Sequence, residues 1–220
     1  EKPLRFIISD VYVEGKGVVV KGRVAQGILF AGRGADAMVL PIGDVVTVQT
    51  ILSSSESYAI AGDTVDVFLM GIMDIARICP GNIIVEQQQE ISSTTTTEYQ
   101  SPQKLLLHKR VQAKLLIMED LTIPIIRGAQ VLFHMHSLDV PAIVTKLLSS
   151  KKNTKTNKNM SDSSNNRPPR VLTGGCQAIV ELKLQEKICM ETYSDCRSLG
   201  RFVLRRSGNT IAIGVIEKIL

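Results

Sequence analysis

Tryptophan is absent from this sequence of 220 residues, and aromatic residues make up only 4% of it. Modules that bind single-stranded nucleic acid stack bases on exposed aromatic side chains, so this scarcity disfavours a free-standing RNA-binding β-barrel module. No apolar run approaches the roughly 20 residues that a membrane-spanning helix needs. The first residues also lack the charged start and apolar centre of a signal peptide. We therefore expect a cytoplasmic protein with no membrane partner.

Cysteine is scarce as well, and no Cys-x-x-Cys pair occurs. In a chain of this length, isolated cysteines are typical of reduced, mostly buried thiols in a cytosolic protein, rather than of a disulfide framework or a zinc site. The four cysteines are Cys79, Cys176, Cys189 and Cys196.

Motifs for nucleotide chemistry are missing. The sequence has no Gly-x-x-x-x-Gly-Lys-Ser/Thr phosphate loop, and the glycine-rich segment 27–34 lacks both the lysine and a following helix. Asn157-Lys158 is followed by Asn-Met and so does not complete the Asn-Lys-x-Asp motif that reads guanine. We expect these residues to bind no GTP, hold no cofactor and carry no catalytic group. Because the sequence begins at Glu1 without methionine and enters strand-like sequence at once, we interpret it as a fragment.

The composition indicates a globular protein, with 44% hydrophobic and 21% charged residues. The net charge of +5 favours contact with polyanions through counterion release. Much of the excess lies in segment 151–158, however, so the folded body should be nearly neutral. The overall charge is therefore weak evidence for RNA binding.

Short strands separated by glycine are predicted for the first half of the chain, and no stretch has sustained helical periodicity. This pattern indicates an antiparallel β-barrel domain over residues 1–86. The predicted strands are 4–13, 17–25, 37–40, 45–52, 64–70 and 82–85.

A polar segment of low complexity, residues 87–103, follows and is predicted to be a linker or loop. A second β-barrel is then predicted over 104–220, so the fold class is all-β with two antiparallel barrels. Segment 151–170 has only Met160 as a large apolar residue and should form a disordered insert in the second barrel. The predicted strands are 109–118, with Val111, Ala113, Leu115 and Ile117 on one face, 130–136, 142–148 and 177–184.

The last twenty residues predict a closing hairpin. Ser207-Gly208-Asn209 supplies residues that accept positive φ, which suits a tight turn between strands 201–206 and 210–218. Alternation puts Phe202 and Leu204 on one face of the first strand. On its other face lie Arg201, Val203 and Arg205, and in the second strand the buried row is expected to be Ile211, Ile213 and Val215.

Residues 199–205, Leu-Gly-Arg-Phe-x-Leu-Arg, with Thr-Ile-Ala-x-Gly at 210–214, resemble the end of the third domain of eukaryotic translational GTPases. That class holds elongation factor 1-alpha and release factor 3. The resemblance covers nearly the whole chain apart from the two polar segments. The Tyr-x-Asp-x-x-x-Leu-Gly spacing of 193–200 looks most like the ribosome-rescue GTPase that works with Pelota. Other matching motifs are Lys2-Pro-Leu-Arg-Phe, Gly17-x-Val-x-Lys-Gly-Arg-Val, Ala61-Gly-Asp-x-Val, Ile123-Pro-Ile-x-x-Gly, Pro141-Ala-Ile-Val-Thr-Lys-Leu and Ala178-Ile-Val-Glu-Leu.

The resemblance implies that the third domain grips a tRNA-shaped partner near the hairpin. Gly200, Arg201, Phe202 and Arg205 are the candidate contacts, although Val203 replaces a threonine of the family pattern. From the sequence alone, Gly200 could equally be a backbone turn and the arginines a solvated strand face.

The resemblance also implies the other partners. Pelota would bind through domain three, the small ribosomal subunit through domain two, and a GTPase domain absent from this sequence would hold GTP and Mg²⁺ in cis. Such a protein acts in ribosome rescue and in no-go and nonstop mRNA decay. The alternatives are release factor 3 of translation termination and an exosome-bridging relative.

His134 and His136 are two residues apart, which on a strand would place both on one face at the spacing of some metal pairs. Only Asp139 could add a nearby ligand. We therefore predict surface or interface histidines and no metal site.

Overall fold

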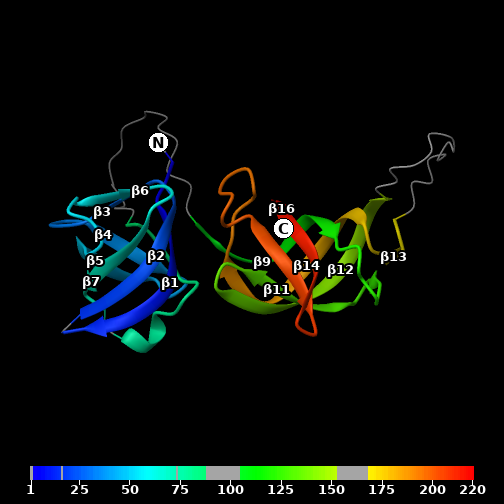
Figure 1. The fold of residues 1–220 in the computed structure, drawn as a ribbon, viewed down its shortest axis with the longest axis horizontal. Coiled ribbons are helices and arrows are strands. Elements are labelled where there is room, and N and C mark those ends of the chain that lie inside the picture. The colour runs from blue at the N-terminus through cyan, green and yellow to red at the C-terminus, as the bar shows by residue number, and fades with distance from the viewer. Residues whose placement is uncertain (1, 16, 73, 88–104, 153–167) are drawn as a thin grey trace, which may run out of the picture. The chain divides into compact units, whose positions relative to one another are not determined.

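The computed structural model describes residues 2–15, 17–72, 74–87, 105–152 and 168–220. The chain divides into two compact units, Glu1–Leu106 and Leu107–Leu220. Each unit contains a closed antiparallel barrel of six strands, which confirms the predicted fold class (Figure 1). Among the described residues, the only helical element is one 3₁₀ turn, η1 (Ile75–Arg77).

The first barrel is closed in the order β1-β2-β7-β5-β4-β8. Each of its six strands begins and ends within one residue of its predicted position. Two strands of three residues, β3 and β6, pair separately and were not predicted, because three residues are too few to show alternation. The strands are β1 (Arg5–Glu14), β2 (Gly17–Gln26), β3 (Ile28–Phe30), β4 (Asp36–Leu40), β5 (Asp44–Ile51), β6 (Tyr58–Ile60), β7 (Thr64–Met70) and β8 (Ile83–Glu86).

The second barrel is closed in the order β11-β12-β14-β9-β16-β15, and β10 pairs with β13 outside it. Alternation in β9 places Val111, Ala113, Leu115 and Ile117 in the core, as predicted. The strands are β9 (Leu107–Ile117), β10 (Ile125–Ile126), β11 (Gln130–Met135), β12 (Leu138–Lys152), β13 (Val171–Leu172), β14 (Cys176–Cys189), β15 (Arg201–Arg206) and β16 (Asn209–Ile219).

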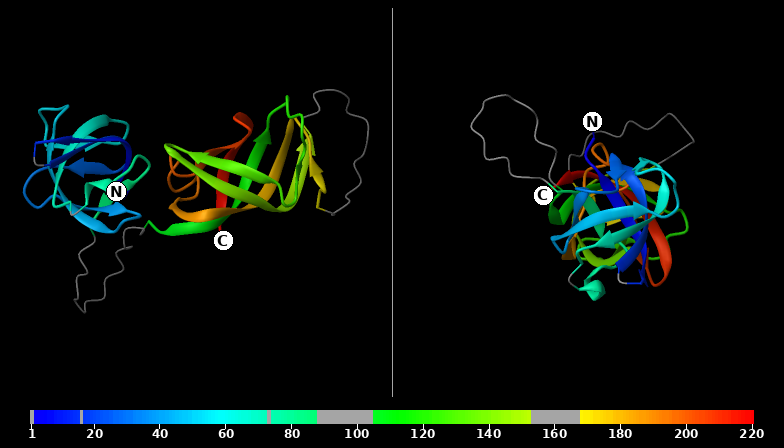
Figure 2. Two further views of the ribbon diagram at one scale, coloured as in Figure 1. Left: turned by 90° about the horizontal axis from the view of Figure 1, so that it is seen from below. Right: turned by 90° about the vertical axis from the view of Figure 1, so that its left-hand side faces the viewer.

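Two strands of this barrel are longer than the sequence predicted. β12 and β14 pair along most of their length, and Figure 2 shows them side by side. The pairing continues through polar residues of β12, with Lys151 opposite Gln177 and Lys152 opposite Cys176. Backbone hydrogen bonds therefore extend these strands beyond the apolar pattern from which they were predicted.

The two polar segments lie mostly outside the described residues. Of the predicted linker 87–103, only Gln87 is described. Of the predicted insert 151–170, Lys151 and Lys152 belong to β12, and residues 168–170 precede β13.

The closing hairpin forms, but its predicted buried row is only partly confirmed: Ile211 is buried, whereas Ile213 is exposed and Val215 is half-buried. Ala212, Gly214 and Ile216 point into the barrel, whereas Ile213 is 48% exposed. The reason is the size of Phe202, which lies opposite Gly214 on β15. A Cβ atom on residue 214 would lie 2.3 Å from Phe202 Cζ, so only glycine fits beneath this ring, and alternation then places Ala212 and Ile216 on the same inward face.

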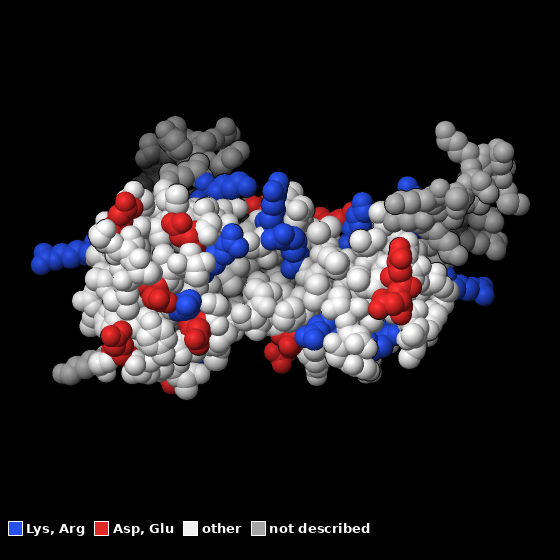
Figure 3. All heavy atoms as spheres, viewed as in Figure 1, with Lys and Arg blue, Asp and Glu red and all other residues white. Residues whose placement is uncertain are grey.

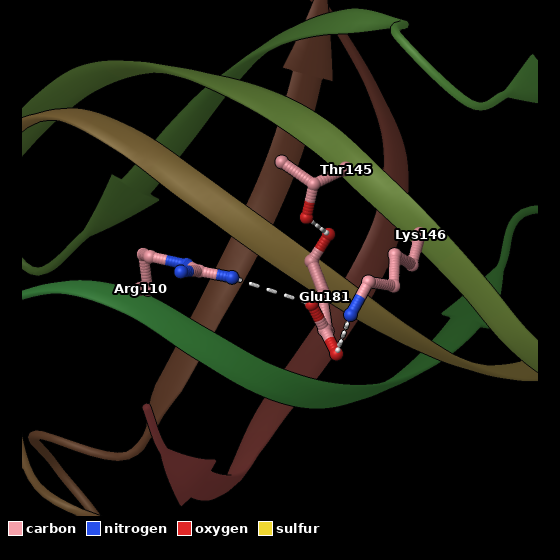
Figure 4. A network of polar contacts seen from close by, with 4 residues as sticks. All are labelled: Arg110, Thr145, Lys146 and Glu181. Carbon is pink, nitrogen blue, oxygen red and sulfur yellow. Dashed lines mark hydrogen bonds and ion pairs between the residues drawn. The ribbon is translucent and has the colours of Figure 1, made fainter.

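A buried carboxylate ties three strands of the second barrel together (Figure 4). Glu181 on β14 accepts a hydrogen bond from Lys146 Nζ of β12 at 3.0 Å. Its other carboxylate oxygen lies 3.7 Å from Arg110 Nη2 of β9. The Thr145 hydroxyl donates to the Glu181 backbone carbonyl at 3.1 Å. The charges of Lys146 and Arg110 thus compensate a carboxylate that is largely withdrawn from water.

Candidate partner-binding face

The outer face of β15 carries the two arginines that the sequence singled out. Arg201, Val203 and Arg205 point outward, while Phe202 and Leu204 are 3% and 0% exposed in the core. The predicted division of this strand into two faces is therefore confirmed.

Both guanidinium groups are anchored on one side only. Arg201 Nε donates to the Arg197 carbonyl at 3.2 Å, and Arg205 Nη2 donates to the Gly208 carbonyl at 3.1 Å. Within the described part of the chain, neither arginine forms an ion pair. Each side chain is thus oriented by the backbone and keeps further N–H donors for an acidic or carbonyl partner.

Gly200 and Phe202 support this face from behind. A Cβ atom on residue 200 would lie 2.4 Å from Tyr193 Cα, so glycine lets the preceding loop pack against the start of β15. The Phe202 ring stacks on Phe133 with 4.3 Å between ring centroids. In this conformation Gly200 and Phe202 position the arginines, and the Phe202 ring is not accessible to a partner.

The loop before β15 is itself well ordered by hydrogen bonds. Tyr193 N donates to the Ile216 carbonyl at 2.9 Å, which fixes the loop to β16. The Thr192 hydroxyl donates to Asp195 Oδ2 at 2.6 Å. The tyrosine and aspartate of the sequence motif thus have structural roles beside the arginine face.

An apolar row crosses the same face and was not predicted. Val203 on β15 lies opposite Ile213 on β16, which in turn lies opposite Leu116 on β9. Ile213 and Leu116 are 48% and 44% exposed. The signal in the sequence was the alternation of small Ala212 and Gly214 with Ile213, which marks the small residues as the inner row. We call Arg201, Val203, Arg205, Ile213 and Leu116 the arginine face.

The histidines lie at the edge of this face. His134 is the neighbour of Val203 on β11, and its Nδ1 lies 2.7 Å from Asp139 Oδ1. His136 is not on the strand, as the sequence had suggested, but begins the turn to β12 with φ of 42°. Its two ring nitrogens are shielded from water and have no hydrogen-bond partner among the described residues. Burial, assisted by nearby His134, lowers the pKa of His136 from 6.5 to about 4.

Thiols and potential metal ligands form no site elsewhere in the described part of the chain. Figure 3 shows basic and acidic side chains interspersed on both units in that view. All four cysteines are free, with Cys79 exposed and the other three buried, which agrees with the predicted thiols. No group of three or more metal-ligating side chains occurs within the described residues. None of the helices described there is long and apolar enough to span a membrane.

Comparisons with known proteins relate the chain to translation factors. Residues 110–217 match the family described as GTP-eEF1A C-terminal domain-like. The whole chain is 33% identical over 222 residues to Protein HBS1 of Drosophila melanogaster, covering 30% of that protein. It is 30% identical over 207 residues to the eukaryotic peptide chain release factor GTP-binding subunit of Zygosaccharomyces rouxii, covering 93% of this chain and 28% of that protein.

Further relatives agree. Elongation factor 1-alpha of Pyrobaculum arsenaticum is 32% identical over 225 residues, covering all of this chain and 45% of that protein. The crystal structure of sup35 complexed with GDP matches 99% of this chain and 48% of its own, with a TM-score of 0.76 and 25% identity. The chain thus spans less than half the length of each of these relatives.

Two successive closed barrels, matched along their whole length by translational GTPases, define the C-terminal barrel module of such a GTPase. The second barrel is thus similar to the GTP-eEF1A C-terminal domain-like family.

Proposed function

We propose that this chain is the barrel module of a translational GTPase that delivers Pelota to stalled ribosomes, for ribosome rescue and no-go or nonstop mRNA decay. The second barrel would hold Pelota, and the first would contact the small ribosomal subunit. A GTPase domain in cis would bind GTP and Mg²⁺ and hydrolyse the nucleotide in the cytoplasm. The match to HBS1 along the whole of this chain supports this assignment.

The arginine face is the observation that carries the proposal. It combines exposed aliphatic side chains with two arginines that have no acidic partner among the described residues. Protein interfaces favour this combination, because an apolar centre excludes water from the charged hydrogen bonds around it. Arg201 and Arg205 would pair with acidic or carbonyl groups of Pelota, while Ile213 and Leu116 would be covered.

Release factor 3 is the second candidate. Its GTP-binding subunit in Zygosaccharomyces rouxii is 30% identical, and sup35 has a similar structure. In that case the same face would hold a termination factor instead of Pelota. An exosome-bridging relative would keep the barrels and use them without GTP hydrolysis.

The RNA-binding alternative has one observation in its favour. Phe30 and Tyr58 lie opposite each other on β3 and β6 and are 57% and 43% exposed. Exposed aromatic residues on neighbouring strands are what a base-stacking surface requires. The translation-factor relatives along the whole chain nevertheless favour the barrel module.

Substitution of both arginines tests the proposed face. In calorimetric titrations with purified Pelota, Arg201→Ala with Arg205→Ala should weaken binding tenfold or more, about 1.4 kcal/mol. The melting temperature should be nearly unchanged, because neither side chain is buried. Arg127→Ala with Arg170→Ala, also exposed arginines of the second unit, serves as the matched control and should bind like the wild type. Equal affinity of the Arg201/Arg205 variant and the wild type would reduce the arginine face to ordinary surface charge.

A further inference from the structure

A concavity of about 530 Å³ lies beside the β10–β13 ribbon and shares no residue with the arginine face. Basic and aliphatic side chains line it, and none of the described lining residues is acidic. The lining residues are Arg127, Lys146, Leu147, Leu148, Pro168, Pro169 and Arg170.

Two of the lining arginines are neighbours across the ribbon. Ile126 pairs with Val171 in the antiparallel register, which places Arg127 and Arg170 at the same end. Within the described residues, neither guanidinium has a hydrogen bond or an ion pair. Like charges held side by side repel each other, so a bound anion between them would be stabilising.

The backbone holds both arginines in fixed places. Arg127 occupies a turn closed by the hydrogen bond from Ala129 N to the Ile126 carbonyl at 3.1 Å. Gly128 has φ of 86°, as a type II turn requires, and its N–H donates to the Val144 carbonyl at 2.7 Å. Arg170 follows two prolines, whose rings restrict the chain. A ligand would therefore find the two charges largely preorganised.

The rest of the lining indicates the kind of ligand. Lys146 is already paired with Glu181 at 3.0 Å, so the uncompensated charge is that of the arginines (Figure 4). Leu148 is 37% exposed and, with the two prolines, offers an aliphatic surface. No aromatic side chain is available for base stacking among these residues, which disfavours single-stranded RNA.

We propose that this concavity binds an acidic linear peptide segment of a further protein partner. Carboxylates of the peptide pair with Arg127 and Arg170, and one of its aliphatic side chains packs on Leu148 and Pro169. The site is independent of the arginine face and gives the barrel module a second attachment point.

The test is a titration of the isotope-labelled chain with the blocked octapeptide Asp-Glu-Leu-Asp-Glu-Leu-Asp-Glu, followed by amide chemical shifts. We expect saturable shifts at Gly128, Leu148 and Val171 with a dissociation constant below about 1 mM. Arg127→Gln with Arg170→Gln should weaken binding at least tenfold while leaving Pelota binding and the unfolding temperature unchanged. The matched control, Arg201→Gln with Arg205→Gln, should bind the peptide like the wild type. A peptide with Asn and Gln in place of Asp and Glu should not bind.

Three results would overturn the proposal. The first is the absence of saturable shifts at these amides, and the second is equal peptide affinity of the Arg127/Arg170 variant and the wild type. The third is that an oligouridylate of equal charge binds to this concavity more tightly than the octapeptide does. That result would make the concavity a nucleic-acid site. Leu148→Asn leaves both arginines intact and should weaken peptide binding several-fold. It therefore tests the concavity independently of the Arg127/Arg170 variant.

Discussion

At the scale of single residues, the second barrel depends on a matched large and small pair. The Phe202 ring occupies the space where a side chain at position 214 would lie, and it stacks on Phe133 behind the arginine face. Close packing of this kind tolerates an added methyl group poorly. The conformation of β15, and with it the placement of Arg201 and Arg205, rests on this pair.

Gly214→Ala should therefore destabilise the second barrel by about 2 kcal/mol, because the new methyl group meets the Phe202 ring. Urea unfolding of the purified chain measures this loss. Phe202→Leu combined with Gly214→Ala should restore part of the lost stability, because the smaller leucine side chain makes room for the new methyl group. Strictly additive effects of the two substitutions would contradict direct contact between the two positions.

His136 should make the stability of the second barrel depend on pH. Burial lowers its pKa in the folded chain to about 4, below the ordinary value of 6.5. The unfolded chain then binds more protons between these two values, so the free energy of unfolding should fall as pH decreases from about 6.5 towards 4. Urea unfolding at several pH values measures the slope.

His136→Asn is the matched variant, because asparagine tolerates the positive φ of this turn position. The variant should lose less stability on acidification than the wild type. The same slope in both proteins would show that His136 is not the group that titrates.

At the scale of elements, the strands were predictable wherever alternation or glycine spacing extended over four or more residues. The six strands of the first barrel follow this rule, as does the inward row of β9. The inward row of β16 did not, because apolar residues occur on both of its faces and the Phe202 ring of β15 leaves room only for glycine at position 214. The apolar residues of the arginine face were not predicted for the same reason. The arginines were found because a charged side chain alternates visibly with Phe202 and Leu204.

The β15–β16 hairpin provides a prediction at this scale. Ser207 and Gly208 have φ of 49° and 84°, the two positive values of a type I′ turn. Ser207→Asn should raise stability by about 0.5 kcal/mol, because asparagine accepts this conformation more readily. Ser207→Val should lower stability by about 1 to 2 kcal/mol, because a β-branched side chain is strained there. Unchanged urea midpoints in both variants would show that the turn does not control the hairpin.

At the scale of the whole molecule, the chain combines two separately built barrels without a nucleotide-binding motif in its sequence. Its relatives are translational GTPases more than twice as long as the matched part. Under the proposed function, this chain would hold a partner while a GTPase domain in cis binds the nucleotide. The arginine face and the concavity at β10–β13 would let the second barrel hold two ligands at once.

The affinity of the purified chain for Pelota, compared with its affinity for a termination factor in the same calorimetric experiment, tests the central claim most directly. The proposed function predicts that Pelota binds at least tenfold more tightly, and that Arg201→Ala with Arg205→Ala removes most of this preference. Tighter binding of the termination factor would contradict the claim and assign the chain to release factor 3.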